Sequence, residues 1–173
     1  MTQRQEFTVI RSYNGFELLQ YLPCSIAEDK VSADYSSAGS MAFRSLFSYI
    51  SQGNKRSEKI AMTAPVISAQ KADKSAEDEW FVSFVMPAGS TVEHLPDPTD
   101  PRVVLRQLAA ETCIAASFRG KANEDVMKRK VVELRALAAK ENIALSDETR
   151  ICRFDPPMKP GYMQYNEIVI PIN

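Results

Sequence analysis

Apolar residues recur with two different spacings along this chain, which predicts an alternation of strands and helices. Residues 7–12 and 16–22 are rich in β-forming side chains, and Asn14-Gly15 lies between them. Asn-Gly between two such runs is the strongest short-range signal of a β-hairpin, because its residues tolerate positive φ. We therefore expect a hairpin that ends at Pro23, while a further strand reaching about Val31 is left open by the pattern.

A helical period follows the predicted hairpin. Phe43, Leu46, Phe47 and Ile50 fall at i, i+3, i+4 and i+7, which is one face of a helix over residues 40–52. Ser36, Ser37 or Ser40 could cap the start of this helix, and Gly53 stands where a left-handed residue after its end belongs. A second helix over residues 123–141 is predicted by an apolar face at Met127, Val131, Leu134 and Ala138, with Asn123 as its cap.

Extended segments surround the two predicted helices. The run WFVSFVM at residues 80–86 alternates so that Trp80, Val82, Phe84 and Met86 share one side. Further strands are expected over residues 102–108, 112–118, 150–154 and 164–172, and a polar loop is expected over 70–79. The extended run at 59–66 contains Pro65, which cannot donate to a ladder, so we expect the strand to bulge or leave the sheet there and to turn Met62 and Ala64 toward the core.

The order of these elements gives the fold class. Strand, strand, helix, strand, strand occurs twice, at about 7–86 and 102–172, joined by a proline-rich connection at 87–101. We predict an α+β fold in a single domain spanning residues 1–173. Its barrel-like antiparallel sheet consists of two pseudo-symmetric ββαββ repeats, with both helices packed on one side. A cleft is expected where the halves meet.

Composition and charge exclude several classes of function. The chain has 173 residues, 45% hydrophobic and 25% charged, with a net charge of -1. These proportions are typical of a globular protein, and such a charge gives no field that would attract nucleic acid. No apolar run approaches the length of a membrane span, and no apolar leader follows the first residues. We expect a cytoplasmic protein with no nucleic-acid partner.

Few side chains are available for metal or nucleophilic chemistry. The sequence has three cysteines and one histidine. Cys24, Cys113 and Cys152 are far apart and odd in number, so we expect small buried hydrophobes and no disulfide framework. His94 is the single imidazole and therefore a weak candidate for iron ligation, although it lies in a loop where a solvated histidine is the commoner case. No paired-histidine metal site is possible.

Several motifs resemble one family along most of the chain. FRSLFSYI at residues 43–50, followed by KIAMTAPV at 59–66, closely resembles the SOUL heme-binding protein family. VSFVMP at 82–87, Pro96-Asp97-Pro98, the phenylalanine-glycine lead at 118–120 and Asn-Glu-Ile at 166–168 match in the same order, so the resemblance covers about 7–172. It implies a barrel-like fold of two pseudo-repeats that binds a tetrapyrrole such as heme. Some members use an axial histidine before the first helix, but residues 23–41 contain none, which leaves binding through apolar burial.

Six residues are candidates for holding such a ligand. Lys59, with Lys55 and Arg56 nearby in sequence, suits the propionates of heme at the edge of a groove, although a solvated loop is the favoured explanation of these charges. Met158 and Met163 flank a proline-rooted loop that could close over an apolar ligand, and Met62 lies in the most specific motif. The remaining two candidates are Tyr165 and Glu167.

Glu167 is the most informative polar residue. Alternation places it with Tyr165 and Val169, opposite Ile168 and Ile170 in the last strand. If both faces of that strand are covered, this carboxylate must be paired or must serve a ligand. Candidate partners are Arg102, Arg106, Arg119 and Arg150.

Two functions follow from these features. The first is a heme- or tetrapyrrole-binding protein that holds a planar hydrophobic ligand reversibly in a cleft and acts as a carrier, buffer or sensor. The alternative is a small-molecule hydrolase or effector-binding domain on the same scaffold, with Glu167 as general base or charge stabiliser.

Overall fold

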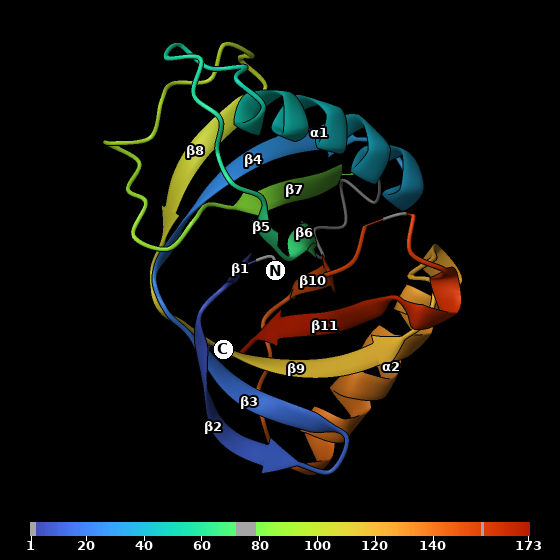
Figure 1. The fold of residues 1–173 in the computed structure, drawn as a ribbon. Helices are drawn as coiled ribbons and strands as arrows, with labels where there is room; N and C mark the ends of the chain where they lie inside the picture. Colours follow the sequence, from blue (N-terminus) through green and yellow to red (C-terminus); the bar gives the residue numbers. More distant parts are fainter. Residues whose placement is uncertain (1–2, 72–78, 157) are drawn as a thin grey trace.

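A computed structural model describes residues 3–71, 79–156 and 158–173, and its main feature is one curled antiparallel sheet (Figure 1). The sheet has nine strands in the order β2-β3-β9-β11-β10-β6-β7-β4-β8. Their bounds are β2 Phe7–Tyr13, β3 Phe16–Tyr21, β4 Cys24–Ser32, β6 Val66–Lys71, β7 Glu79–Val85, β8 Val103–Leu108, β9 Glu111–Arg119, β10 Glu148–Arg153 and β11 Tyr165–Pro171. The helices are α1, Tyr35–Ile50, and α2, Glu124–Lys140. The predicted α+β class with a curled antiparallel sheet is confirmed.

Three short elements lie outside this sheet. β1, Gln3–Arg4, pairs in parallel with β5, Thr63–Ala64, over two residue pairs. A single turn of 3₁₀ helix, η1, covers Gly161–Met163 just before β11. Neither helix in the described parts of the chain is long and apolar enough to cross a membrane.

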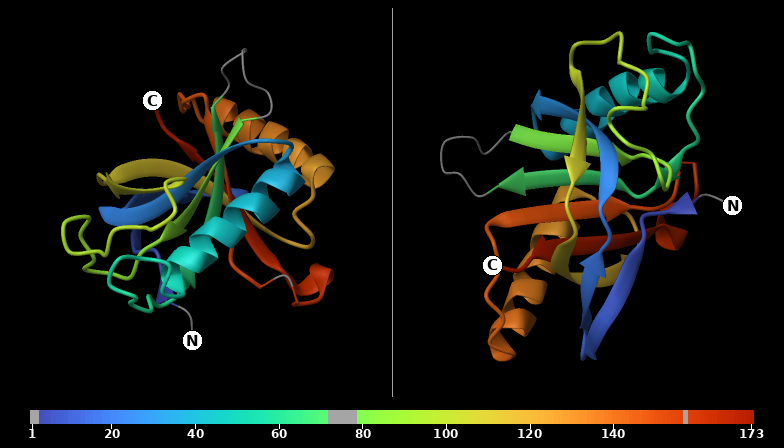
Figure 2. Two further views of the ribbon diagram at one scale, coloured as in Figure 1. Left: turned by 90° about the horizontal axis from the view of Figure 1, so that it is seen from above. Right: turned by 90° about the vertical axis from the view of Figure 1, so that its left-hand side faces the viewer.

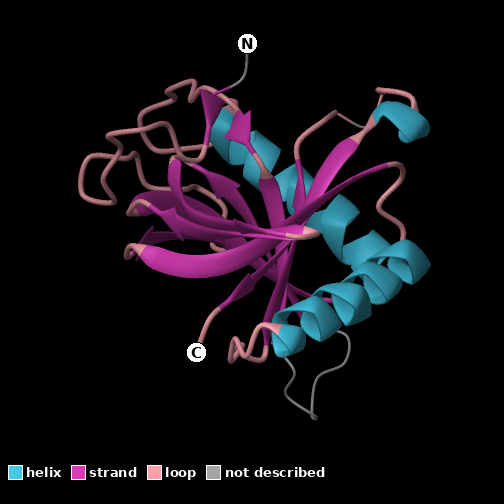
Figure 3. Ribbon diagram, turned by 90° about the horizontal axis from the view of Figure 1, so that it is seen from below, coloured by secondary structure: helices cyan, strands magenta, loops and turns pink. Residues whose placement is uncertain are grey.

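Both helices pack on the same face of the sheet. One apolar cluster contains Leu46 and Tyr49 of α1, Leu134 and Ala138 of α2, and residues of the central strands such as Ile168. Figures 2 and 3 show the two helices on the outside of the curled sheet. Trp80, Val82, Phe84 and Met86 all belong to this cluster, as their alternation predicts. A second cluster, with Leu19, Ile67 and Val169 among its members, lies on the inner face.

The two halves meet where β6 pairs with β10. On one side of this seam are β10, β11 and β9 with α2, and on the other are β6, β7 and β4 with α1. Three strands of the main sheet precede α1, where the sequence pattern predicts two, because β4 is a full nine-residue strand. The relation between the halves as ββαββ repeats remains a prediction.

β4 lacks the alternation of apolar and polar residues by which a strand is recognised in a sequence. Its residues are buried on both faces, so apolar and polar positions do not alternate. Its charged residues are paired across the sheet or with α1. Glu28 accepts from Arg106, Asp29 accepts from the Ser45 hydroxyl at 2.5 Å, and Lys30 lies 3.4 Å from Glu79.

The start of α1 differs from its prediction. The helix begins at Tyr35, and Asp34 caps it by accepting from the backbone N–H of Ser37 at 2.8 Å, so none of the proposed serines is the cap. Phe47, which is predicted to face the core, is 50% exposed, because the buried face is centred on small residues such as Ala38 and Ala42.

The end of α1 also differs from its prediction. The left-handed residue is Gln52, with φ 86°, and not Gly53. Gly53 is required for a different reason, since a Cβ there would lie 2.4 Å from the Ser48 carbonyl oxygen, to which the Gly53 N–H donates at 2.8 Å. By contrast, α2 begins as predicted, with the Asn123 side chain accepting from the Val126 N–H.

The segment around Pro65 leaves the ladder as expected. β5 ends at Ala64, and β6 begins after Pro65 and pairs with β7 and β10. Met62 is 37% exposed and therefore does not turn into the core, whereas Thr63 is buried. Of the polar loop predicted over 70–79, residues 70 and 71 belong to β6, residue 79 belongs to β7, and residues 72–78 lie outside the described parts. The predicted hairpin is confirmed, with Tyr13 opposite Phe16 and φ 93° at Gly15.

Gly53→Ala is expected to destabilise the protein by about 1–3 kcal/mol, because the new methyl group must displace the end of α1 or the Ser48 carbonyl group. Urea unfolding followed by circular dichroism measures the change. Gly161→Ala is the control, since its Cβ would meet nothing closer than 3.5 Å. Equal stability of the two variants would contradict the close-approach explanation.

Candidate functional site

A buried carboxylate on β11 forms the centre of the candidate site. Glu167 is 5% exposed and points to the inner face of the sheet, away from both helices. Nη2 of Arg4 donates to Oε1 at 3.2 Å and to Oε2 at 3.0 Å, and the Tyr165 hydroxyl donates to Oε2 at 2.6 Å. The carboxylate therefore has a cationic partner and a neutral donor, as burial of a charge requires.

The partner of Glu167 is none of the four arginines considered from sequence. Arg102 pairs with Asp100, Arg106 with Glu28, and Arg150 with both Glu111 and Glu148. Arg119 donates to the Met163 carbonyl at 3.1 Å and lies over the Tyr165 ring. Arg4 is 163 positions from Glu167. It also lies in a segment without strong periodicity, so no local pattern could have identified it.

Aromatic rings surround the Arg4 guanidinium. Its central carbon lies 4.5 Å from the centroid of the Phe7 ring and 4.5 Å from that of the Phe154 ring. Tyr165 packs edge-on against Phe154 with centroids 5.2 Å apart. Phe7, Phe154, Tyr165 and Glu167 are called the Arg4 cage below. Rings and a carboxylate in this arrangement are suited to a planar cation.

The charges of the cage are mutually stabilised. Burial by itself would lower the pKa of Arg4, but the charge of Glu167 and the hydrogen bonds outweigh this effect and raise it. Burial and the hydrogen bond to Glu167 raise the pKa of Tyr165. The cage therefore holds a permanent cation, an acceptor carboxylate and a phenol that keeps its proton at neutral pH.

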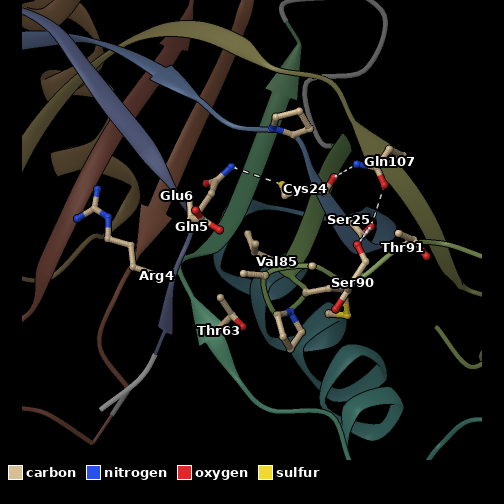
Figure 4. Close-up of a pocket in the computed structure, with 15 residues that line it drawn as sticks. Arg4, Gln5, Glu6, Cys24, Ser25, Thr63, Val85, Ser90, Thr91 and Gln107 are labelled. Carbon is tan, nitrogen blue, oxygen red and sulfur yellow. Dashed lines mark hydrogen bonds between the residues drawn. The ribbon is translucent and has the colours of Figure 1, made fainter. Parts of the chain in front are cut away.

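A small open pocket of about 160 Å³ lies beside Arg4 (Figure 4). The Ser25 hydroxyl in this pocket is within hydrogen-bond distance of the Ser90 carbonyl, at 2.8 Å, and of the Gln107 side-chain oxygen, at 2.9 Å. Gln5 Nε2 lies 3.7 Å from Cys24 Sγ, whose thiol pKa is raised by burial. Since small-molecule sites usually measure about 300–1,000 Å³, this pocket does not enclose a porphyrin.

The other candidate residues fall into two separate groups. Lys59 is exposed and forms an isolated bridge with Ser51 at the end of α1, and Met62 follows it along the chain. Met158 is 90% exposed and Met163 is 44% exposed, and both lie near η1. Figure 1 shows η1 apart from the segment that leads from α1 to β5. The structure brings together Tyr165 and Glu167 but does not bring all six candidates together.

Phe47 is a surface aromatic, although the helical spacing predicts that it faces the core. Its ring stacks on Phe43 with centroids 5.7 Å apart, and Phe43 packs edge-on against Phe84 of β7. One sequence feature could have indicated that Phe47 is exposed. The small residues Ala38, Ala42 and Ser45 lie at helical spacing on a different face of α1. Those residues allow close approach to the sheet and leave Phe47 toward solvent.

The histidine and the cysteines occupy different environments. His94 is exposed, and its Nδ1 lies 2.6 Å from the Thr91 hydroxyl. Cys113 and Cys152 are buried as expected, and burial raises the pKa of Cys152 to about 12, while Cys24 is only half-buried. Within residues 3–71, 79–156 and 158–173, no group of three or more histidine, cysteine or acidic side chains could hold a metal ion.

We expect a double-mutant cycle of Arg4→Met and Glu167→Gln to give a coupling energy of about 1–2 kcal/mol. The Arg4 side chain is 34% exposed, so solvent screening keeps the coupling below that of a fully buried pair. Chemical unfolding of the four proteins measures it. The exposed pair Arg102–Asp100, treated in the same way, should give less than about 0.5 kcal/mol. Similar values for both pairs would contradict a special role for the buried carboxylate.

Comparison with known proteins identifies one family for this chain and a solved structure with a similar fold. The family model described as SOUL heme-binding protein matches residues 2–171. Heme-binding protein 1 of Xenopus laevis is 28% identical over 125 residues, which are 71% of this chain and 65% of that protein, slightly less than two thirds of its length. Heme-binding protein 1 of Xenopus tropicalis is 25% identical over 89% of this chain and 82% of that protein. A hydrolase from Listeria innocua superposes with a TM-score of 0.68 at 15% identity, over 91% of each chain, which is a likeness of fold.

Proposed function

Because the chain belongs to the SOUL heme-binding protein family, we propose that it binds heme or a related tetrapyrrole reversibly, as a carrier, buffer or sensor. The match over residues 2–171 is the observation that carries this proposal. The relatives named heme-binding protein 1 support the same ligand class. The three unpaired cysteines fit a reducing compartment, and we place the protein in the cytoplasm.

We place the porphyrin on an exposed apolar surface beside the C-terminal half of α1. We assign to this proposed surface, called the α1 face, Phe43 and Phe47 of α1 together with Lys59 and Met62 of the segment that leads to β5. Phe47 and Met62 are 50% and 37% exposed. The Ile60 N–H donates to the Ile50 carbonyl at 2.8 Å, which holds the segment before β5 against the end of α1. Figure 1 shows this segment looping out from the end of α1 and then descending to β5. A flat aromatic ligand can pack there without a deep cavity.

The energetics of such a face favour reversible binding. Burial of the macrocycle contributes about 25 cal/mol per Å² of apolar surface, and the cost of association offsets part of it. Lys59 is exposed and close in sequence to Lys55 and Arg56, so cationic groups are available for the two propionates. In this proposal no side chain ligates the iron, because His94 is exposed in a loop and is not one of the residues of the α1 face. A weakly ligated heme dissociates readily, as a buffer requires.

The alternative function, hydrolysis with Glu167 as general base, has less support. A general base needs a lone pair directed at its substrate, whereas Glu167 is engaged by Arg4 and Tyr165. The hydrolase from Listeria innocua shares the fold at 15% identity, and one fold supports many chemistries. We therefore retain tetrapyrrole binding.

Hemin titration followed at the Soret band tests the proposal and its location. Wild type should show a saturable spectral shift. Phe47→Ala should weaken binding by about tenfold, because it removes exposed aromatic area from the contact. His94→Ala should titrate like wild type. Val132→Ala is the matched control, since Val132 is 69% exposed on α2, away from the α1 face.

Three outcomes would contradict parts of the proposal. Loss of the shift in His94→Ala would make His94 an axial ligand and overturn binding by apolar burial. Weakening by Met158→Ala together with Met163→Ala, with no effect of Phe47→Ala, would move the site to the loop around η1. Absence of any shift in wild type would overturn heme as the ligand.

A further inference from the structure

The Arg4 cage has the composition of a receptor for a planar cation. Two aromatic rings lie at 4.5 Å from the guanidinium carbon, and the carboxylate that faces it is 5% exposed. The rings, the carboxylate and the Tyr165 hydroxyl come from β2, β11 and the residue after β10. These walls are part of the main sheet, so they do not depend on Arg4 for their position.

Arg4 fills this receptor incompletely. One nitrogen, Nη2, makes both hydrogen bonds to Glu167, so the two-pronged geometry that a guanidinium can offer a carboxylate is not used. The Arg4 Nε is buried and has no hydrogen-bond partner in the described parts of the chain. Leaving a buried donor unpaired is costly, so a cation with better geometry can compete with Arg4.

The strand that carries Arg4 is weakly attached. β1 has two residues and pairs only with the equally short β5, in a small sheet separate from the nine-stranded one. The next backbone contact is the Gln5 N–H, which donates to the Ala64 carbonyl at 2.9 Å. Short elements with few hydrogen bonds open at low free-energy cost, whereas the main sheet stays in place.

We propose that the Arg4 cage is a binding site for a planar amidinium or guanidinium cation, and that Arg4 of the same chain occupies this site until such a ligand displaces β1. The ligand head would donate two N–H groups to the two oxygens of Glu167 and lie between the rings of Phe7 and Phe154. Its binding would release β1, so the protein would signal occupancy through its N-terminal strand.

The pocket beside Arg4 could hold the part of the ligand that lies outside the cage. Arg4, Gln5 and Glu6 form one wall of this pocket, and Figure 4 shows the Arg4 side chain pointing away from the other lining residues. Displacement of β1 would therefore join the pocket to the cage. Thr63 lines the same pocket, is 3% exposed, and carries a hydroxyl without a hydrogen-bond partner in the described residues. This hydroxyl could pair with a polar group on the ligand.

This site differs in chemistry from the proposed heme site. Heme carries two anionic propionates, which the Glu167 carboxylate would repel, and the cage contains no exposed lysine. The α1 face consists of other residues, at the end of α1. Failure of one of the two proposals would therefore leave the other unaffected.

Benzamidine binding measured by calorimetry tests the proposal. Arg4→Ala empties the cage and should bind benzamidine about tenfold or more tightly than wild type, since the cation gains both rings and the carboxylate without competition. Benzamide, the neutral analogue, should show no gain. Arg4→Ala combined with Glu167→Gln should lose the gain. Arg102→Ala is the matched control, because it frees Asp100 at an exposed site without rings.

A second measurement uses the unaltered protein and does not depend on the stability of the Arg4 variant. Saturating benzamidine should speed hydrogen exchange at the Gln5 amide, which bonds to Ala64, and leave the amides of β11 protected. A folded Arg4→Ala protein with no gain over wild type would overturn the proposal. An equal gain in Arg102→Ala, an equal response to benzamide, or unchanged exchange at Gln5 under saturation would also overturn it.

Discussion

The pairing of β6 with β10 is the contact on which the rest of the structure depends, because it joins two smaller sheets into one. Six residue pairs connect the strands, from Val66 opposite Arg153 to Lys71 opposite Glu148. Without this seam each half would present an unpaired edge to solvent. With it, the nine strands form one curled sheet that has both helices on its outer face and a second apolar cluster on its inner face.

Partial burial of the carboxylates on the inner face determines how its charges are arranged. Carboxylates placed there lose water and must find cations, since an unpaired buried charge is very costly. Glu28 pairs with Arg106, Glu111 and Glu148 share Arg150, and Glu167 pairs with Arg4. Arg106 and Arg150 belong to strands of the main sheet, whereas Arg4 belongs to β1. The third pair is therefore the one whose cation can leave without breaking the sheet.

The site that we propose on the outer surface has a related physical basis. α1 packs closely on the sheet through small residues, and this close packing leaves Phe47 at the surface with Phe43 behind it. Exposing an aromatic surface of this kind to water costs free energy. A flat ligand that covers the surface removes this cost. The pocket beside β1 is too small for a porphyrin, so our proposal places the ligand on an open face.

The sequence by itself determined the elements whose signals are local. The Asn14-Gly15 hairpin, the α2 cap at Asn123, the alternation at residues 80–86 and the α+β class all follow from spacing and turn chemistry, and the motif around Met62 indicated the family. Alternation also placed Glu167 on the face opposite Ile168. Only the tertiary structure decided that β4 is a strand, that Phe47 is exposed and that Arg4 neutralises Glu167. Each of these depends on residues far apart in the chain, because burial on two faces, helix docking and ion pairing exist only after the sheet has formed.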